Sequence, residues 1–334
     1  ILIVAYITRE LPVGTRVEET AVRFARIEDA IRRVIPSGEI TTLVDNIGLP
    51  NSSINLTYNS TGVMGSQDGD IQIALGKGHR PSADYVRELR ERLPREFPDT
   101  VFSFPPADIV SQILNFGAPA PIDIQVRGGN IDANFAYAER LLKQVKRVPG
   151  VADARIQQSN SRPVFNITLD RAQAQAVGLT TRDVTNSLVV NLAGSSQVAP
   201  TWWLNPATSV TYPIVMQTPQ YDLSSLSALA QLPVSGPGVR TPQVLGGVAH
   251  FARGTSSGLV SQYDVQYMVQ INATTQDRDL GGVARDIRRI LAANADGVPK
   301  GSSVVMLGQV QTMDRAFSGL LWGLLGAIVL IYLL

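Results

Sequence analysis

The chain has 334 residues, which exceeds one ordinary domain of about 100–150 residues, so we expect two or three domains. Hydrophobic residues make up 44% of it, which excludes a wholly disordered chain. Twenty-nine basic and 28 acidic residues leave a net charge of +1, so charge gives no indication of nucleic-acid binding. The chain has no Cys and only two His, which excludes disulfides, thiol nucleophiles and Cys-ligated metals and leaves too few side chains for a histidine metal cluster.

A first unit of alternating strands and helices covers residues 1–105. Phe24, Ile27 and Ile31 recur at three- and four-residue steps, which is typical of one apolar helix face. In chain order, the patterns predict a strand at 1–9, a helix ending near 35, strands at 39–47 and 70–75, a helix from 81–82, and a strand at 100–104. This β-α-β-β-α-β order predicts a ferredoxin-like layer, an α+β fold with two helices on one sheet.

The same order begins again after a predicted linker at 106–120. The patterns predict strands at 121–126, 151–157 and 163–169, a helix at 132–148, and, after an interruption, a strand at 263–273, a helix at 281–291 and a strand at 302–307. We therefore expect a second ferredoxin-like subdomain from residues 121–169 and 259–308. Residues 170–258 are expected to form an inserted small α+β domain with two short helices and strands near 210–217 and 231–234.

The end of the chain is its most apolar segment. Residues 316–334 carry no charge over 19 residues, close to the roughly 20 that cross a bilayer. Trp322 and Tyr332 are aromatic residues of the kind found near membrane interfaces. A buried core helix is the alternative, but such a helix is rarely apolar on every face. We expect a transmembrane helix at 315–334, and we expect the sequence to be a piece of a longer protein that stops inside this helix.

The sequence offers no motif for catalysis. It has no GxSxG, and the run from Gly76 to His79 lacks the pattern of a phosphate-binding loop. Asp68-Gly69-Asp70 is too short for a calcium loop and fits a turn before a strand. We expect no enzyme activity and no cofactor. A membrane-anchored enzyme stays open as an alternative, and it predicts clustered catalytic side chains.

A long loop at residues 48–69 interrupts the first layer. A loop of this length inside a compact domain is usually functional, and its isolated apolar side chains, with the deformable Met64 among them, suit varied ligands. A solvated meander is the alternative. Phe102 and Phe104 share one strand face by alternation; core packing is favoured for them, and pocket lining is the other possibility.

The order of these segments resembles a known family. The segments that carry the resemblance are LPVGTRVEET (11–20), ADIVSQILNFGAPAPIDIQVRG (107–128), VPGVADARI (148–156) and FNITLDRAQAQAVGLTTRDVTNSL (165–188). Over essentially all 334 residues, the chain resembles the large C-terminal periplasmic region of an inner-membrane RND (resistance–nodulation–division) efflux permease, in its hydrophobe or multidrug branch.

The resemblance implies two porter subdomains and, at 170–258, a docking domain facing an outer-membrane channel. It implies a homotrimer in the inner membrane of Gram-negative bacteria, largely periplasmic in this region, that works with a periplasmic adaptor (membrane fusion) protein. Proton flow through segments outside this chain would drive export of hydrophobic or amphiphilic compounds by alternating access. The two layers would hinge about the connector at residues 118–121.

The resemblance also implies site residues. It makes 48–69 a switch loop, with glycines at Gly48, Gly62, Gly65 and Gly69. It assigns substrate binding to Val44, Asn46, Leu49, Tyr58, Met64, Gln72, Phe102, Phe104, Arg155 and Gln157. Leu49 and Gln72 stand where the best-known drug pumps have aromatic residues, so the pocket is expected to be less aromatic and more polar.

Two alternatives stay open within this architecture. A heavy-metal cation permease would use Met thioethers at the cleft, where this chain has Asp68 and Ile113, and Met64 alone is a poor site for a soft cation. A non-transporting export or structural component would have a packed interface between the layers and no ligand cleft.

Overall fold

The computed structural model of the chain describes residues 2–8, 16–49, 65–106, 109–115, 118–160, 162–239 and 241–334. It divides the chain into two compact units. The first unit comprises residues 1–163 and 255–334, and the second comprises residues 164–254. The first unit contains two α+β layers, which we call the first layer and the second layer. The expected α+β class, with two ferredoxin-like layers, an insertion and a C-terminal apolar helix, is confirmed.

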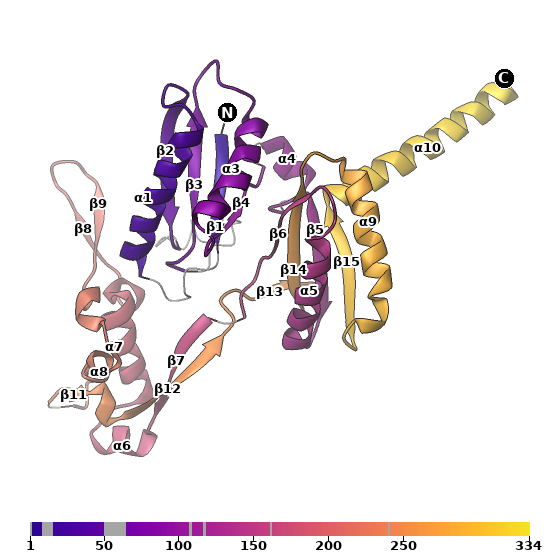
Figure 1. Ribbon diagram of the computed structural model, residues 1–334. Coiled ribbons are helices and arrows are strands. Elements are labelled where there is room, and N and C mark those ends of the chain that lie inside the picture. The colour runs from indigo at the N-terminus through magenta and orange to yellow at the C-terminus, as the bar shows by residue number, and fades with distance from the viewer. Residues whose placement is uncertain are drawn as a thin grey trace. The chain divides into compact units, whose positions relative to one another are not determined.

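The first layer is a four-stranded antiparallel sheet with two helices (Figure 1). Its elements are β1 (Leu2–Thr8), α1 (Val17–Val34), β2 (Ile40–Ile47), β3 (Gly69–Leu75), α3 (Ser82–Glu96) and β4 (Val101–Ser103). The strand order is β2-β3-β1-β4. Phe24, Ile27 and Ile31 are fully buried against the sheet, because their spacing places them on one face of α1. The helix ends at Val34, just before a proline that cannot continue it.

The second layer repeats this topology. Its elements are β5 (Ile122–Gly128), α5 (Ile131–Val145), β6 (Val151–Ile156), β13 (Ser261–Tyr263), β14 (Gln266–Thr275), α9 (Leu280–Ala293), η4 (Ala295–Gly297) and β15 (Ser302–Gly308). Strand β14 lies between β6 and β5, and β15 follows β5, so the order is again second, third, first, fourth. Helix α5 is capped by Asn130, whose side chain accepts from the Ala133 amide at 3.1 Å.

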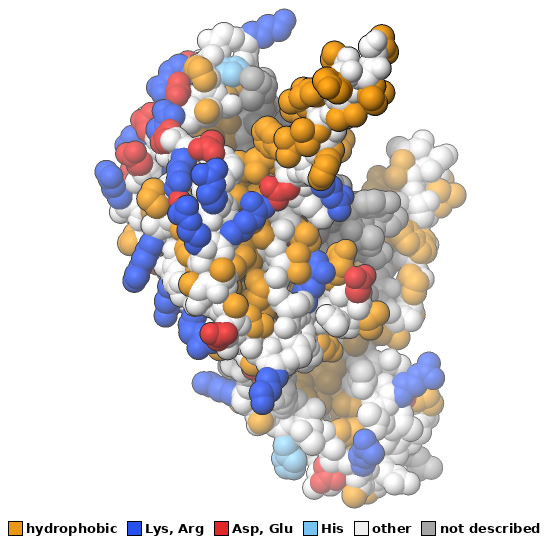
Figure 2. Space-filling model, turned by 90° about the vertical axis from the view of Figure 1, so that its right-hand side faces the viewer, with side chains coloured by type: hydrophobic (Ala, Val, Ile, Leu, Met, Phe, Trp, Pro, Cys, Tyr) orange, Lys and Arg blue, Asp and Glu red, His pale blue; other side chains and the backbone are white. Residues whose placement is uncertain are grey.

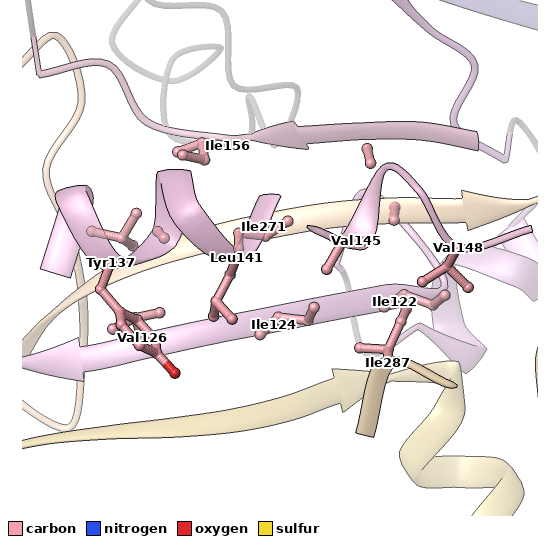
Figure 3. Close-up of a cluster of buried hydrophobic side chains, with 14 of the residues drawn as sticks. Ile122, Ile124, Val126, Tyr137, Leu141, Val145, Val148, Ile156, Ile271 and Ile287 are labelled. Atoms are coloured by element: carbon pink, nitrogen blue, oxygen red, sulfur yellow. The ribbon is translucent and has the colours of Figure 1, made fainter. Parts of the chain in front are cut away.

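Alternation along the strands gives the second sheet two different faces. Ile122, Ile124 and Val126 of β5 point into a core with Leu141 of α5 and Ile287 of α9 (Figure 3). The residues between them on β5 are polar and point to the opposite face of the sheet. A sheet with helices on one face therefore carries a polar face that no helix of its own layer covers.

The second unit has its own small core. Its elements are β7 (Arg162–Leu169), α6 (Arg171–Ala176), α7 (Thr181–Ala193), η1 (Ser195–Gln197), β8 (Thr201–Leu204), β9 (Thr211–Ile214), η2 (Gln220–Leu223), α8 (Leu226–Ala230), β10 (Pro233–Val234), β11 (Gln243–Val244), η3 (Leu245–Gly247) and β12 (Ala249–Ser256). Leu179, Val184, Leu232 and Leu245 pack at its centre. Thr180 and Asp183 form a capping box that starts α7.

The structure differs from the sequence-based expectation most clearly in three places. The inserted unit spans 164–254 where 170–258 was expected, because β7 pairs with β12 and both strands belong mostly to it. The range expected as a linker, 106–120, contains a short helix, α4 (Ile109–Leu114). Helix α10 (Gln309–Leu333) begins six residues before 315, because helical hydrogen bonding does not require apolar residues and the apolar run marks only its later part.

Helix α10 is, among the described residues, the one helix long and apolar enough to span a membrane. Its mean hydropathy is 2.1 over the most apolar part, and Figure 2 shows its projecting end covered by hydrophobic side chains. Its first turn is different, since Val310 is fully buried in the core of the second layer and Met313 packs against that core. The helix therefore starts inside the second layer.

We expect Gly69→Ala to destabilise the first layer by about 1–3 kcal/mol, because a Cβ at this position would collide with the Asn46 carbonyl and lie 2.7 Å from the Phe24 ring. The midpoint of thermal unfolding measures the change. Gly38→Ala is the matched control, because a Cβ there meets nothing within 4 Å. Equal midpoints for the two variants would contradict the close approach at Gly69.

Candidate functional site

Three of the expected substrate-binding residues lie together on the first sheet. Val44 pairs with Gln72, and Asn46 pairs with Asp70, in the register of β2 on β3. The side-chain amides of Asn46 and Gln72 both donate to Oδ2 of Asp70, each at 3.0 Å. Asp70 is 5% exposed. We call this group, Val44, Asn46, Asp70 and Gln72, the first polar patch.

The two ends of the 48–69 loop are joined beside this patch. The Gly48 amide donates to the Asp68 carbonyl at 2.8 Å, and the Asp68 amide donates to the Gly65 carbonyl at 3.1 Å. Gly48 has φ +77°, a left-handed conformation that favours glycine. Asp68 is fully buried, and its Oδ2 accepts from Gln67 Nε2 at 3.1 Å. These hydrogen bonds therefore hold the two ends of the 48–69 segment together, and we call this closed pair of ends the loop base.

The structure describes only some of the other residues that were expected to belong to this loop. Leu49 follows β2 and is 46% exposed, available for contact with a ligand. Tyr58, Gly62 and Met64 lie outside the described residues, so their roles stay predictions. Gly69 begins β3 and is part of the sheet.

Asp45 lies between the patch residues in sequence but points to the other sheet face. Burial raises the pKa of Asp45 to about 7, helped by a hydrogen bond and charge repulsion from Glu28 and by the charge of Asp70, while Arg32 opposes the shift. Its Oδ1 has no hydrogen-bond partner among the described residues. A carboxyl group that titrates near neutral pH therefore lies directly beneath the first polar patch.

Arg155 and Gln157, the other expected polar residues, lie on the polar face of the second sheet. Arg155 pairs with Asn272, which in turn pairs with Asp123, so the three form a row across β6, β14 and β5. Asn272 Nδ2 donates to Gln157 Oε1 at 3.0 Å. We call this row with Gln157 the second polar patch.

Sequence analysis missed Asp123 and its neighbours. Asp123 is 2% exposed, and its carboxylate accepts from Gln125 at 2.5 Å and from Gln270 at 3.2 Å. Burial raises the pKa of Asp123, although the two amide hydrogen bonds oppose the shift. The strict alternation of PIDIQV with polar residues at every second position was the available signal.

Phe102 and Phe104 serve both roles that the sequence allowed. Both rings are nearly buried and belong to the core of the first layer, and the Phe102 ring packs edge-on against Phe97 with centroids 6.3 Å apart. Both also line a cavity of about 830 Å³ within the first unit. Its other walls come from α3, from the turn between α5 and β6, from the first residues of β6, and from the residues after β14. The cavity therefore lies where the two layers meet.

The described residues contain no group of three or more His, Cys, Asp or Glu side chains that could hold a metal ion. Of the two positions where the metal branch was expected to carry Met, Asp68 is buried at the loop base and Ile113 is 68% exposed on α4. The two polar patches offer carboxylate, amide and guanidinium groups, which can bind and orient a ligand.

Comparison with known proteins identifies relatives of the chain. A model of the AcrB/AcrD/AcrF family matches residues 7–334. The chain is 28% identical over 212 residues to the cation efflux system protein CusA of Escherichia coli (strain K12), which covers 64% of this chain and 20% of that protein. It is 26% identical over 209 residues to the nickel-cobalt-cadmium resistance protein NccA of Alcaligenes xylosoxydans xylosoxydans. This alignment covers 60% of this chain and 18% of that protein.

The fold is shared with a solved structure. An X-ray crystal structure of a heavy metal efflux pump matches with a TM-score of 0.78 at 21% sequence identity, covering 98% of this chain and 33% of that one. The aligned part of this chain corresponds to about a fifth of the curated relatives' length and a third of the solved chain.

We expect Asp45 to make the protein less stable as pH rises from about 4 to about 7. Its folded-state pKa of about 7 lies above the ordinary value of 3.8, so the folded state binds more protons in this window and loses that advantage as the group ionises. Asp45→Asn should therefore raise the unfolding midpoint at pH 8 and flatten its pH dependence. Thermal unfolding between pH 4 and 8 measures this, with the exposed Asp222→Asn as control. An unchanged pH slope would contradict the shifted pKa.

Proposed function

This chain belongs to the AcrB/AcrD/AcrF family, and on that premise we propose that it forms the porter and docking part of a proton-driven RND efflux permease. Helix α10 would anchor it in the bacterial inner membrane, with the two units in the periplasm. We propose that it binds and releases cargo without covalent chemistry. The match over residues 7–334 carries this proposal.

We propose that the cargo is a metal cation. The relatives are named for cation efflux and for nickel, cobalt and cadmium resistance, which supports the metal alternative over the expected hydrophobic compounds. The metal-ligating side chains of this chain narrow the class of cation further. With no Cys, and with Asp68 and Ile113 at the positions where the metal branch was expected to carry Met, the chain lacks the thiolate and paired thioether ligands that favour Cu(I).

The donors that remain lie in the first polar patch and at the loop base beside it. Asp70 and the neighbouring Asp68 offer carboxylate oxygens, and Asn46 offers an amide oxygen, beside the loop that contains Met64. Oxygen ligands suit hard and borderline divalent cations. We therefore propose a borderline divalent cation of the cobalt, nickel or zinc class, which passes the loop base on its way through the porter region.

Amphiphilic organic compounds are the second candidate, and the cavity at Phe102 and Phe104 favours them. Its volume of about 830 Å³ lies within the range of pockets for small organic ligands. Its walls combine these aromatic rings with Val101, Pro94 and Val151, together with charged side chains of both signs. A bare cation needs no such apolar walls.

We propose that the whole protein assembles in the way that is typical of its family. It would act as a homotrimer with a periplasmic adaptor and an outer-membrane channel, and the second unit would face that channel. Alternating access would come from hinge motion of the two layers about the connector at 118–121.

We expect the full-length protein to raise the inhibitory concentration of at least one of cobalt, nickel or zinc salts at least fourfold in a pump-deleted Gram-negative host. Asp68→Ala should remove most of that gain, because it deletes a buried carboxylate at the loop base. Growth inhibition and accumulation of the metal in the cells measure the effect. Asp222→Ala, an exposed position in the second unit, is the control.

The same host separates the two cargo classes. A gain in resistance to amphiphilic compounds alone, with metal accumulation unchanged, would contradict the cation proposal and support the second candidate. No gain for any tested compound, with the protein correctly inserted and assembled, would contradict the efflux proposal itself.

A further inference from the structure

Strand β6 turns one carboxylate out of its sheet. The register of β6 on β14 shifts between Asn272 and Thr274, so that Asp153 and Ala154 together oppose a single residue. This is a β-bulge, and bulges change the direction of side chains. Asp153 there has φ +54°, a left-handed conformation that is strained for most residues and that Asp and Asn adopt more readily than others.

The carboxylate that the bulge redirects is bound by the first layer. Arg90 of α3 donates from Nε to Oδ1 at 3.0 Å and from Nη2 to Oδ2 at 2.6 Å. The backbone amide of Phe104 also donates to Oδ2, at 3.0 Å. The pair is bidentate, and its side chains are only 16% and 7% exposed, so solvent screens it little.

Arg90 makes two further contacts. Its Nη1 donates to Gln276 Oε1 at 2.9 Å, which adds a second contact with the second layer just after β14. Its guanidinium lies 5.5 Å from the centre of the Phe104 ring, within the range of a cation–π contact. One side chain of α3 therefore holds two separate segments of the second layer.

These groups contribute to neither hydrophobic core, since Arg90, Asp153 and Gln276 lie outside both clusters. A buried ion pair is weak evidence for stability, and its best-attested use is to fix one arrangement among several. Backbone strain at a redirected side chain likewise points to a function. All three residues line the cavity of the first unit.

We propose that Arg90 and Asp153 form a latch between the two layers. The closed latch holds α3 against the bulge of β6 and sets the width of the cavity between them, and separation of the layers during transport requires that it open. The latch is a positioning device whose effect on export rests on the proposed permease function. Its closed state can be measured without any cargo.

The chain provides its own control pair. Arg87 and Asp277 join the same two layers at 2.9 Å, but their side chains are 48% and 58% exposed, where an ion pair contributes little. If the latch depends on the burial of the Arg90–Asp153 pair, loss of the exposed Arg87–Asp277 pair should change the contact between the layers little.

Hydrogen–deuterium exchange on the full-length protein tests the closed latch. We expect Arg90→Met and Asp153→Asn each to speed amide exchange in residues 101–106 at least tenfold, because the Phe104 amide loses its charged acceptor or the arginine that holds that acceptor in place. Asn tolerates the left-handed conformation, so Asp153→Asn keeps the bulge and removes only the charge. Asp277→Asn should stay within twofold of the wild type, as should residues 24–31 of α1 in every variant.

Two results would overturn the latch. One is unchanged exchange at 101–106 in both Arg90→Met and Asp153→Asn. The other is an equal rise at 101–106 and at 24–31 in Asp153→Asn, which would mean loosening of the whole first layer and not release of a contact.

A cross-link tests the need for opening. Because the chain has no Cys, Arg90→Cys with Asp153→Cys introduces a unique pair here, in a full-length background whose other cysteines are replaced. We expect a short, reducible bis-maleimide across this pair to lower efflux at least tenfold, with recovery on reduction. Full efflux by the cross-linked protein would contradict the proposal that the latch must open during transport. If the wild type exports nothing, the proposed function fails, while the exchange experiment still decides whether the latch exists.

Discussion

Each of the two layers of this chain is a sheet with helices on one face only, and that asymmetry governs the rest of the structure. Burial of the helix-facing side chains removes apolar surface from water and holds each layer together. The opposite face must satisfy its polar groups without a partner layer of its own. It does so with side-chain amides and carboxylates that bind one another, as Asp70 does with Asn46 and Gln72. The polar faces of the two sheets therefore depend on hydrogen bonds among their own side chains.

The sequence predicted both layers because their signals are local. Three- and four-residue steps in the helices and alternation in β5 and β7 depend only on neighbours along the chain. The repeat of element order then indicated two ferredoxin-like layers without any long-range information. The helix at 109–114 was missed because six residues between Pro105-Pro106 and Gly117 carry too little periodicity to distinguish a helix from a linker.

The candidate site was only partly predictable, for a physical reason. Val44, Asn46 and Gln72 were identified through the resemblance, and the register of β2 on β3 brings them together. The Arg90–Asp153 pair could not be found in this way, because its partners are 63 residues apart. Alternation would place Asp153 on the same face as Arg155, and the bulge that breaks this alternation has no signature in VADARI beyond an Asp that tolerates it. Long-range pairing and backbone irregularity are properties of the folded chain.

The start of α10 has a mechanical consequence. The 25 residues of this helix run without a break at a rise of about 1.5 Å each, and its first turn is buried in the second layer through Val310. In the chain, the helix follows directly on the edge strand β15, whose last residue is Gly308. A tilt of the helix axis therefore rotates the second sheet with it, because no flexible linker lies between the helix and β15 to absorb the rotation.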